Sequence, residues 1–512
     1  MIRNLTLTQR AMLTFAGNLV VQIAEFLTGF FISPFIIRGL GSQLYGAWGM
    51  LQQILGYFSL TELRATNSLR FLLSLQQHRE SNSDEKQRLI GSTLVLMALS
   101  FPFTIALGLG LIWFLPNIIR IEPNYTAGLR IALIILLVNA VLDRILAIPM
   151  HILKAQNIDY AGMGINTAMV LTGSLLSGLA IWLGYGLPGL AAATMANVLL
   201  ISIGRFWVAR RFIPWMAFKK PSRDEFLRFL RTSGLLFVSG LASLLLYSTD
   251  TLLVGFMLGP AIAATYATSG VVLRMIGEPL YQIIGAGNAG LIGLCGQGDW
   301  ARVANIRKEM YFILLFSMTV LGTGVIALNG PFLKLWLGAE FFGGNLLTLL
   351  LVISIILTFL ARIDFTITNA MLFLREQTWA LFCAGIAALS IGFILLKVIG
   401  IGGMALGMTI GNLVLLSFAW KLIQRRMPTY SSRLAKDLVI PGISIITLFG
   451  FAYLAGTQIK INSWISFAGY GIAIGTVASL IGWFWVLTGD VRKTLFNRIK
   501  NNVPLQKYTK KR

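Results

Sequence analysis

Residues 344–373 read GNLLTLLLVISIILTFLARIDFTITNAMLF, an apolar run in which Arg362 and Asp364 are the only charged residues. A bilayer core of about 30 Å takes about 20 apolar residues of helix, so this stretch is long enough to cross a membrane. The same window predicts thirteen further spans, at residues 11–37, 43–73, 89–114, 127–153, 160–183, 187–209, 232–258, 261–291, 308–336, 378–398, 401–423, 435–456 and 464–488. The sequence therefore predicts an all-α integral membrane protein with about fourteen transmembrane helices.

The composition of the whole chain agrees with this prediction. Of 512 residues, 56% are hydrophobic and 12% are charged, whereas an average soluble domain is about 25% charged. The chain has two cysteines, in separate apolar stretches, and only two histidines. We therefore expect neither a disulfide framework nor a metal cluster. The sequence shows no set of nucleophile, base and acid and no phosphate-binding loop, so we do not expect an enzyme.

Lysine and arginine are distributed unevenly along the chain, whose net charge is +23. Most of them fall in every second loop and in the tail 491–512, and the alternate segments hold only six, Arg38, Arg120, Arg130, Lys334, Lys397 and Lys460. Because cytoplasmic loops accumulate positive residues, both termini are predicted to be cytoplasmic, in a cell membrane. The basic tail is then expected to meet anionic lipid headgroups rather than nucleic acid.

The chain resembles itself at an offset of 221 residues. This offset pairs Asn67 with Asn288 and Asp143 with Asp364, and polar residues at membrane depth are rare enough for such pairs to be informative. It predicts a six-helix lobe at 1–215, a cytoplasmic linker at 216–231 and a second six-helix lobe at 232–430. Helices 13 and 14 follow at 431–490. Two lobes of six helices enter the membrane from the same side, so they are expected to be pseudo-symmetric around a central cavity.

Several short motifs resemble a known family. Residues 40–48 read LGSQLYGAW, and the segments Gly186-Leu187-Pro188-Gly189 and Gly400-Ile401-Gly402-Gly403 precede apolar spans. These motifs are similar to those of the polysaccharide (O-antigen, lipid-linked oligosaccharide) flippases of the multidrug/oligosaccharidyl-lipid/polysaccharide exporter superfamily. The family usually has Asp-Leu-Gly where this chain has Glu62-Leu63-Arg64, so this site is expected to carry a different charge here.

The resemblance implies a transporter that moves an undecaprenyl-diphosphate-linked oligosaccharide to the outer leaflet by alternating access. Such a protein serves lipopolysaccharide or other surface polysaccharide biosynthesis, beside a polysaccharide polymerase and glycosyltransferases. Two alternatives belong to the same superfamily, an ion-coupled multidrug or cation exporter and a lipid II flippase. No cofactor is expected beyond a coupling Na⁺ or H⁺.

Charged residues at membrane depth are the candidate functional residues, because each costs about 2.5–3.5 kcal/mol if it faces lipid. Arginine matches phosphate oxygens with two parallel hydrogen bonds, so the candidates for diphosphate binding are Arg64, Arg70, Arg144, Arg274, Arg362 and, beside them, Asn67 and Asn288. Buried carboxylates can carry a coupling ion, and the candidates for that role are Glu25, Glu62, Asp143, Asp250, Glu278 and Asp364. Internal salt bridges are the alternative role for both groups.

Helical spacing refines two of these expectations. Arg274 and Glu278 are four residues apart, which is the spacing of an ion pair on one helix. In a regular helix Glu62 and Arg70 share a face, and Arg64 lies roughly opposite to them.

Overall fold

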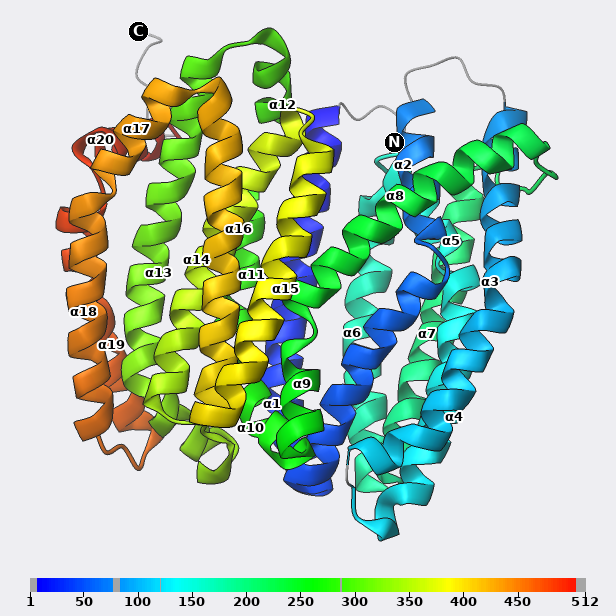
Figure 1. The fold of residues 1–512 in the computed structure, drawn as a ribbon, viewed down its shortest axis with the longest axis horizontal. Helices are drawn as coiled ribbons and strands as arrows, with labels where there is room; N and C mark the ends of the chain where they lie inside the picture. Colours follow the sequence, from blue (N-terminus) through cyan, green and yellow to red (C-terminus); the bar gives the residue numbers. More distant parts are fainter. Residues whose placement is uncertain (1–6, 77–82, 120, 286–287, 503–512) are drawn as a thin grey trace, which may run out of the picture. The chain divides into compact units, whose positions relative to one another are not determined.

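The structure is a computed structural model whose described backbone comprises residues 7–76, 83–119, 121–285 and 288–502. Within these ranges it is helical and contains no strand (Figure 1). The chain divides into two compact units, residues 1–267 and 268–512. Of the described helices, twelve are long and apolar enough to cross a membrane, which confirms the all-α membrane class.

The first unit contains ten helices along the described chain. They are α1 (Leu7–Thr61), α2 (Ala65–Leu75), α3 (Ser83–Ile118), α4 (Pro123–Leu146), α5 (Ile148–Ala155), α6 (Met163–Trp182), α7 (Gly186–Phe212), α8 (Arg223–Tyr247), α9 (Asp250–Leu258) and α10 (Pro260–Ser269), the last of which crosses the boundary between the units. The long α1 holds two predicted spans, and Gly41 interrupts it between them with φ 75° and ψ 169°. Glycine adopts this backbone without strain because it has no Cβ.

The helix α8 explains why the first unit extends beyond residue 215. It begins with a capping box, in which Ser222 and Glu225 each accept a hydrogen bond from the other's backbone N–H. Its Ser233 hydroxyl donates to Ser68 of α2 over 2.8 Å, and both side chains are buried. The boundary between the units, at Ala267 and Thr268, therefore lies C-terminal to the linker predicted at 216–231.

The second unit continues with α11 (Val271–Gly285), α12 (Asn288–Gln297), α13 (Trp300–Trp336), α14 (Asn345–Ala370), α15 (Leu374–Ile399), α16 (Ile401–Arg426), α17 (Pro428–Asp437), α18 (Val439–Gln458), α19 (Trp464–Ile481) and α20 (Gly489–Asn502). The span predicted at 261–291 is divided among α10, α11 and α12, each too short to be counted as a crossing helix. This division, together with the two predicted spans in α1, accounts for the difference between the twelve candidate crossing helices and the fourteen predicted spans. The number of fourteen spans stays a prediction.

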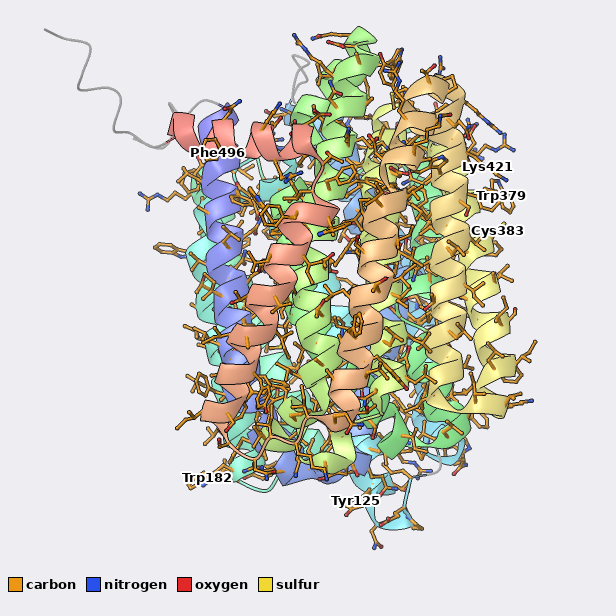
Figure 2. The ribbon with its side chains drawn as sticks, turned by 90° about the vertical axis from the view of Figure 1, so that its left-hand side faces the viewer. Tyr125, Trp182, Trp379, Cys383, Lys421 and Phe496 are labelled. Carbon is orange, nitrogen blue, oxygen red and sulfur yellow. The ribbon has the colours of Figure 1, made fainter. Side chains whose placement is uncertain are left out.

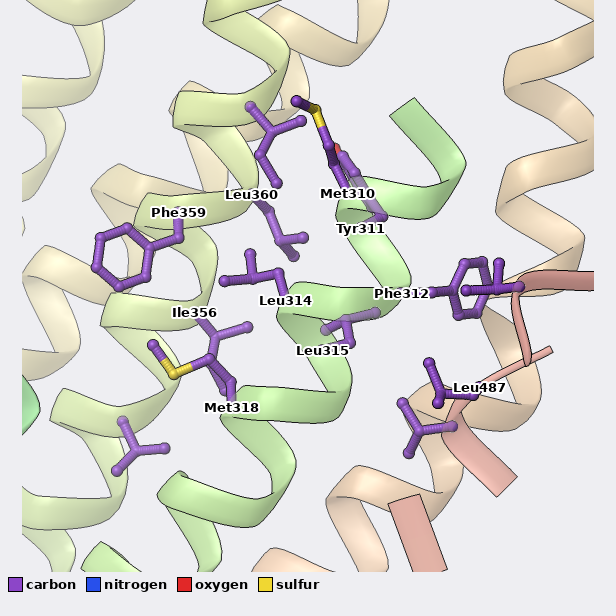
Figure 3. Packing of buried hydrophobic residues seen from close by; sticks show 14 of the residues in the cluster. Met310, Tyr311, Phe312, Leu314, Leu315, Met318, Ile356, Phe359, Leu360 and Leu487 are labelled. Atoms are coloured by element: carbon purple, nitrogen blue, oxygen red, sulfur yellow. The ribbon is translucent and has the colours of Figure 1, made fainter. Parts of the chain in front are cut away.

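The core of the second unit surrounds α13. Met310, Phe312, Leu314 and Met318 project from this helix toward α14 on one side and toward Leu487 on the other (Figure 3). At one end of the unit, α20 runs across the bundle, and Phe496 lies at the same end as Lys421 of α16 (Figure 2). A basic helix across the end of a bundle is typical of a membrane interface.

Candidate functional site

The junction between α1 and α2 places the first candidate arginine. Leu63 and Arg64 both have left-handed backbones, with φ 51° and 56°. Two successive residues other than glycine in this region cost of order 1–3 kcal/mol each and persist only where the surroundings impose them. The helix therefore breaks at these two residues, and the break changes the direction of the Arg64 side chain.

A polar cavity of about 460 Å³ lies between α2 and α8 in the first unit. From α2 it is lined by Arg64, Asn67 and Arg70, with Phe71 and Ser74, and from α8 by Leu236, Ser239, Gly240 and Ser243. Arg64 thus shares a cavity with Arg70, whereas a regular helix would have placed the two on opposite faces. That expectation was wrong because the helix is broken at Leu63 and Arg64.

Gly240 allows α8 to approach the Arg64 side chain closely. A Cβ atom added at Gly240 would stand 2.8 Å from Nη2 of Arg64 and closer still to Nε. The Nε atom of Arg64 is buried and has no hydrogen-bond partner among the described residues. A buried donor without an acceptor is costly, so the described contacts leave the Arg64 guanidinium incompletely satisfied where it lines the cavity.

The charge of the cavity defines the kind of ligand that it can hold. Two guanidinium groups line it, and none of its described lining residues is acidic. Asn67 and the serine hydroxyls supply further hydrogen-bonding groups. The arrangement is that of an anion site, and a phosphate or diphosphate group would match it.

Gly240 provides a direct test of this geometry. Replacing Gly240 with valine is expected to displace the Arg64 side chain and fill part of the cavity, and so to lower anion binding at least about tenfold. The loss of stability should be that typical of overpacking, about 1–3 kcal/mol. Gly234, whose added Cβ would meet no atom within 4 Å, gives the matched control in the same helix. Binding of a diphosphate probe to the purified chain measures the difference, and equal affinity of the Gly240→Val and Gly234→Val variants would refute the assignment.

Glu62 and Arg144 lie inside the first unit and do not line this cavity, although Glu62 is close enough to Arg64 for their charges to interact. Arg144 is 6% exposed, and its terminal nitrogens donate to Thr104 Oγ1 (2.8 Å), the Phe58 carbonyl (2.5 Å) and Thr61 Oγ1 (2.6 Å). These bonds join α4 to the end of α1 and to α3. Glu62 is 4% exposed; Oε1 accepts from Thr66, and Oε2 is buried with no partner within the described chain.

The other acidic candidates of the first unit are dispersed. Glu25 and Asp143 are exposed on α1 and α4. Asp250 begins α9, where it accepts from the Thr251 backbone N–H over 2.8 Å and from the Tyr266 hydroxyl over 3.0 Å. Asp250 therefore belongs to a polar cluster at a helix junction, and Asp143 lies close enough to Arg205 of α7 for their charges to interact.

In the second unit, two arginine–carboxylate pairs differ in burial. Nη1 of Arg362 lies 2.8 Å from Glu278, and both side chains are partly exposed. Asp364, on the other side of α14, is fully buried and receives Nε and Nη2 of Arg307 at 2.7 and 2.6 Å. The Asn288 side chain lies outside the described residues, and Arg274 is exposed on α11.

Sequence reasoning missed two groups. Arg307 was assigned to a cytoplasmic segment because the predicted span began at residue 308, but it lies within α13 and is 2% exposed. Ser239 and Ser243, with Gly240 between them, form the α8 wall of the cavity. Their spacing of four residues inside an apolar span was a signal that could have identified this wall.

The fold and the cavity define a multi-span membrane protein whose first unit contains a polar cavity lined by two arginines. The family model described as "Polysaccharide biosynthesis protein" matches residues 14–286, more than half of the chain. The chain belongs to this family.

A curated relative and solved structures extend the comparison. The "Uncharacterized membrane protein EpsK" of Bacillus subtilis (strain 168) is 23% identical, and the alignment covers 95% of this chain and 98% of EpsK. The structure of the lipid II flippase MurJ in an inward closed conformation matches with a TM-score of 0.65 and 15% identity, over 95% of this chain and 99% of MurJ. An inward-facing multidrug resistance MATE family transporter of the MOP superfamily matches with a TM-score of 0.62 and 14% identity, over 81% and 96% of the two chains. The fold is therefore that of the membrane transporters of this superfamily.

Proposed function

We propose that the chain is a flippase that moves a polyprenyl-diphosphate-linked oligosaccharide from the cytoplasmic to the outer leaflet by alternating access, for surface polysaccharide biosynthesis. The observation that carries the proposal is the cavity between α2 and α8, where Arg64 and Arg70 lie with no acidic residue among the described lining. Membership of the polysaccharide biosynthesis family supports a saccharide cargo.

The location of the cavity supports loading from the cytoplasmic leaflet. By the predicted topology, α2 leads out of the membrane on the cytoplasmic side. A diphosphate headgroup in that leaflet would reach Arg70, which is exposed, before Arg64, which is half-buried. The exposed arginine then attracts the anion, and the more buried one binds it where charge interactions are stronger.

A multidrug or cation exporter is the less favoured function, since a cation would require carboxylates where this cavity has guanidinium groups. Lipid II remains an alternative cargo. Loss of the gene separates the two cargoes: a surface-polysaccharide defect with normal cell-wall synthesis supports the proposal, and arrested cell-wall synthesis supports lipid II.

Binding to the purified full-length chain tests the site. Geranylgeranyl diphosphate is the probe, and geranylgeraniol, with the same chain and no phosphate, is the matched ligand. We expect the diphosphate to bind at least about 100-fold more tightly, because two charge-assisted hydrogen bonds contribute about 1.5–3 kcal/mol each. Arg64→Ala and Arg70→Ala should each reduce this preference, whereas Arg130→Ala, on a predicted outer segment, should leave it unchanged. Equal affinity for the two ligands would disprove diphosphate recognition.

A further inference from the structure

A second cavity in the first unit has the opposite character. This apolar groove has a volume of about 550 Å³ and lies among α3, α4, α5, α7 and the segment 213–218. Every lining side chain except Ser202 is apolar, and the Ser202 hydroxyl already donates to the Val198 carbonyl within α7. The groove therefore offers no unsatisfied polar group to a ligand and is suited to a hydrocarbon chain.

The groove is open on the outside of the helical bundle. Among its lining residues, Ile203 is 66% exposed and Trp207 is 75% exposed, although both are large and apolar. They belong to α7, a helix long and apolar enough to cross the membrane. At this depth an exposed apolar side chain faces acyl chains, so lipid has direct access to the groove.

One end of the groove is lined by a loop that is fixed to α3. The Lys219 backbone N–H donates to the Gln87 carbonyl over 3.1 Å, and Nε2 of Gln87 donates to the Trp215 carbonyl over the same distance. A Cβ atom added at Gly91 would overlap with the Lys219 carbonyl, so the loop lies directly against α3. These contacts hold Met216 and Phe218 at the end of the groove.

Basic residues flank the segment that lines this end. Arg210, Arg211 and Lys220 are exposed there, and the Arg210 guanidinium lies 5.7 Å from the centre of the Phe206 ring, which itself lines the groove. Four acids begin the neighbouring helices α3 and α8, namely Asp84, Glu85, Asp224 and Glu225. Asp84 and Glu225 are occupied in ion pairs with Lys219 (2.6 Å) and Arg88 (3.1 Å), and the basic residues outnumber the other two acids. The excess charge beside the groove is therefore positive, at the end that the sequence places on the cytoplasmic side.

We propose that the apolar groove binds one acyl chain of an anionic phospholipid, whose headgroup phosphate contacts Arg210, Arg211 and Lys220. A basic pocket between transmembrane helices on the cytoplasmic side is the arrangement that selects anionic headgroups. The groove shares no lining residue with the cavity of Arg64 and Arg70. This lipid site is accordingly independent of the diphosphate site and of the proposed cargo.

The test compares dioleoylphosphatidylglycerol with dioleoylphosphatidylcholine, which have the same chains and different headgroups. Binding to the purified full-length chain is measured by native mass spectrometry. Occupancy of the groove is measured by the quenching of tryptophan fluorescence, with the same lipids brominated on their acyl chains. We expect phosphatidylglycerol to bind tightly and its brominated form to quench the fluorescence of Trp207 to saturation. This quenching should be lost in Trp207→Phe. The triple variant Arg210→Gln, Arg211→Gln, Lys220→Gln should lose at least about tenfold in affinity for phosphatidylglycerol, because each surface charge contributes about 1 kcal/mol.

Two variants separate the site from general attraction of anionic lipid. Ile203→Trp should fill the groove and weaken the binding of both lipids. Lys421→Gln, Arg425→Gln, Arg426→Gln removes three basic residues at the end of α16 and should leave the phosphatidylglycerol bound at the groove unchanged. Equal loss in the two triple variants, no preference between the two lipids, or unchanged phosphatidylglycerol affinity of Ile203→Trp in native mass spectrometry would each overturn the proposal.

Discussion

Replacing Arg64 with glycine is expected to abolish translocation without destabilising the protein. Arg64 holds a left-handed backbone that glycine adopts without a steric penalty, and its buried Nε lacks a partner among the described residues. Replacement by glycine therefore relieves backbone strain of order 1–3 kcal/mol in the folded state. It also makes the unfolded chain more flexible, which lowers stability by only about 0.4–1 kcal/mol. The same change deletes a charged group that binds the diphosphate in our proposal, so we expect translocation to fall at least about 100-fold.

Arg64→Ala is the matched variant, since it removes the same side chain and keeps the strained backbone. Both variants should fail in surface-polysaccharide complementation at equal expression, and Arg64→Gly should unfold at a temperature at least as high as the wild type and higher than Arg64→Ala. Arg64→Lys should retain part of the activity, because it keeps the charge and loses the two-pronged geometry. Full activity of Arg64→Gly would show that this arginine does not touch the cargo.

The spans could be predicted because their signal is local. About 20 consecutive apolar residues identify a crossing helix whatever lies beside it, and this rule found the helices around Asp143 and Asp364. The break at Leu63 and Arg64 has another origin. Neither residue favours a left-handed backbone, so the contacts that α2 makes with α8, including the Ser68–Ser233 hydrogen bond, must impose it. No local pattern encodes such contacts.

The same limit applies to the partners of the buried charges. Arg362 meets Glu278 from another helix, and the spacing rule could not identify this partner because it considers one helix at a time. Asp364 and Arg307 are 57 residues apart in the sequence. Their pairing depends on how α13 lies against α14, which composition and periodicity do not specify.

The buried pair of Asp364 and Arg307 leads to the largest stability effect that we expect. Arg307 also stacks 4.3 Å from the centre of the Trp420 ring of α16 and approaches Ser431 of α17 at 3.4 Å, so one guanidinium joins four helices. Asp364→Ala would leave this arginine buried without its counter-charge. Breaking a buried pair in this way costs about 3–5 kcal/mol, and we expect a loss of that size in the free energy of unfolding measured in mixed micelles.

Glu278→Ala is the control, because its pair with Arg362 has a similar length and partial exposure. Pairs that solvent reaches contribute about 0–1 kcal/mol, so this variant should unfold almost as the wild type does. A cost for Asp364→Ala no larger than that of Glu278→Ala would contradict the distinction drawn from burial. The double variant Arg307→Met with Asp364→Leu should then recover most of the stability, since apolar residues of similar volume can replace a buried ion pair. Its transport activity decides the role of Asp364: normal translocation means that the pair only holds the helices together, and a folded but inactive protein means that the carboxylate takes part in ion coupling.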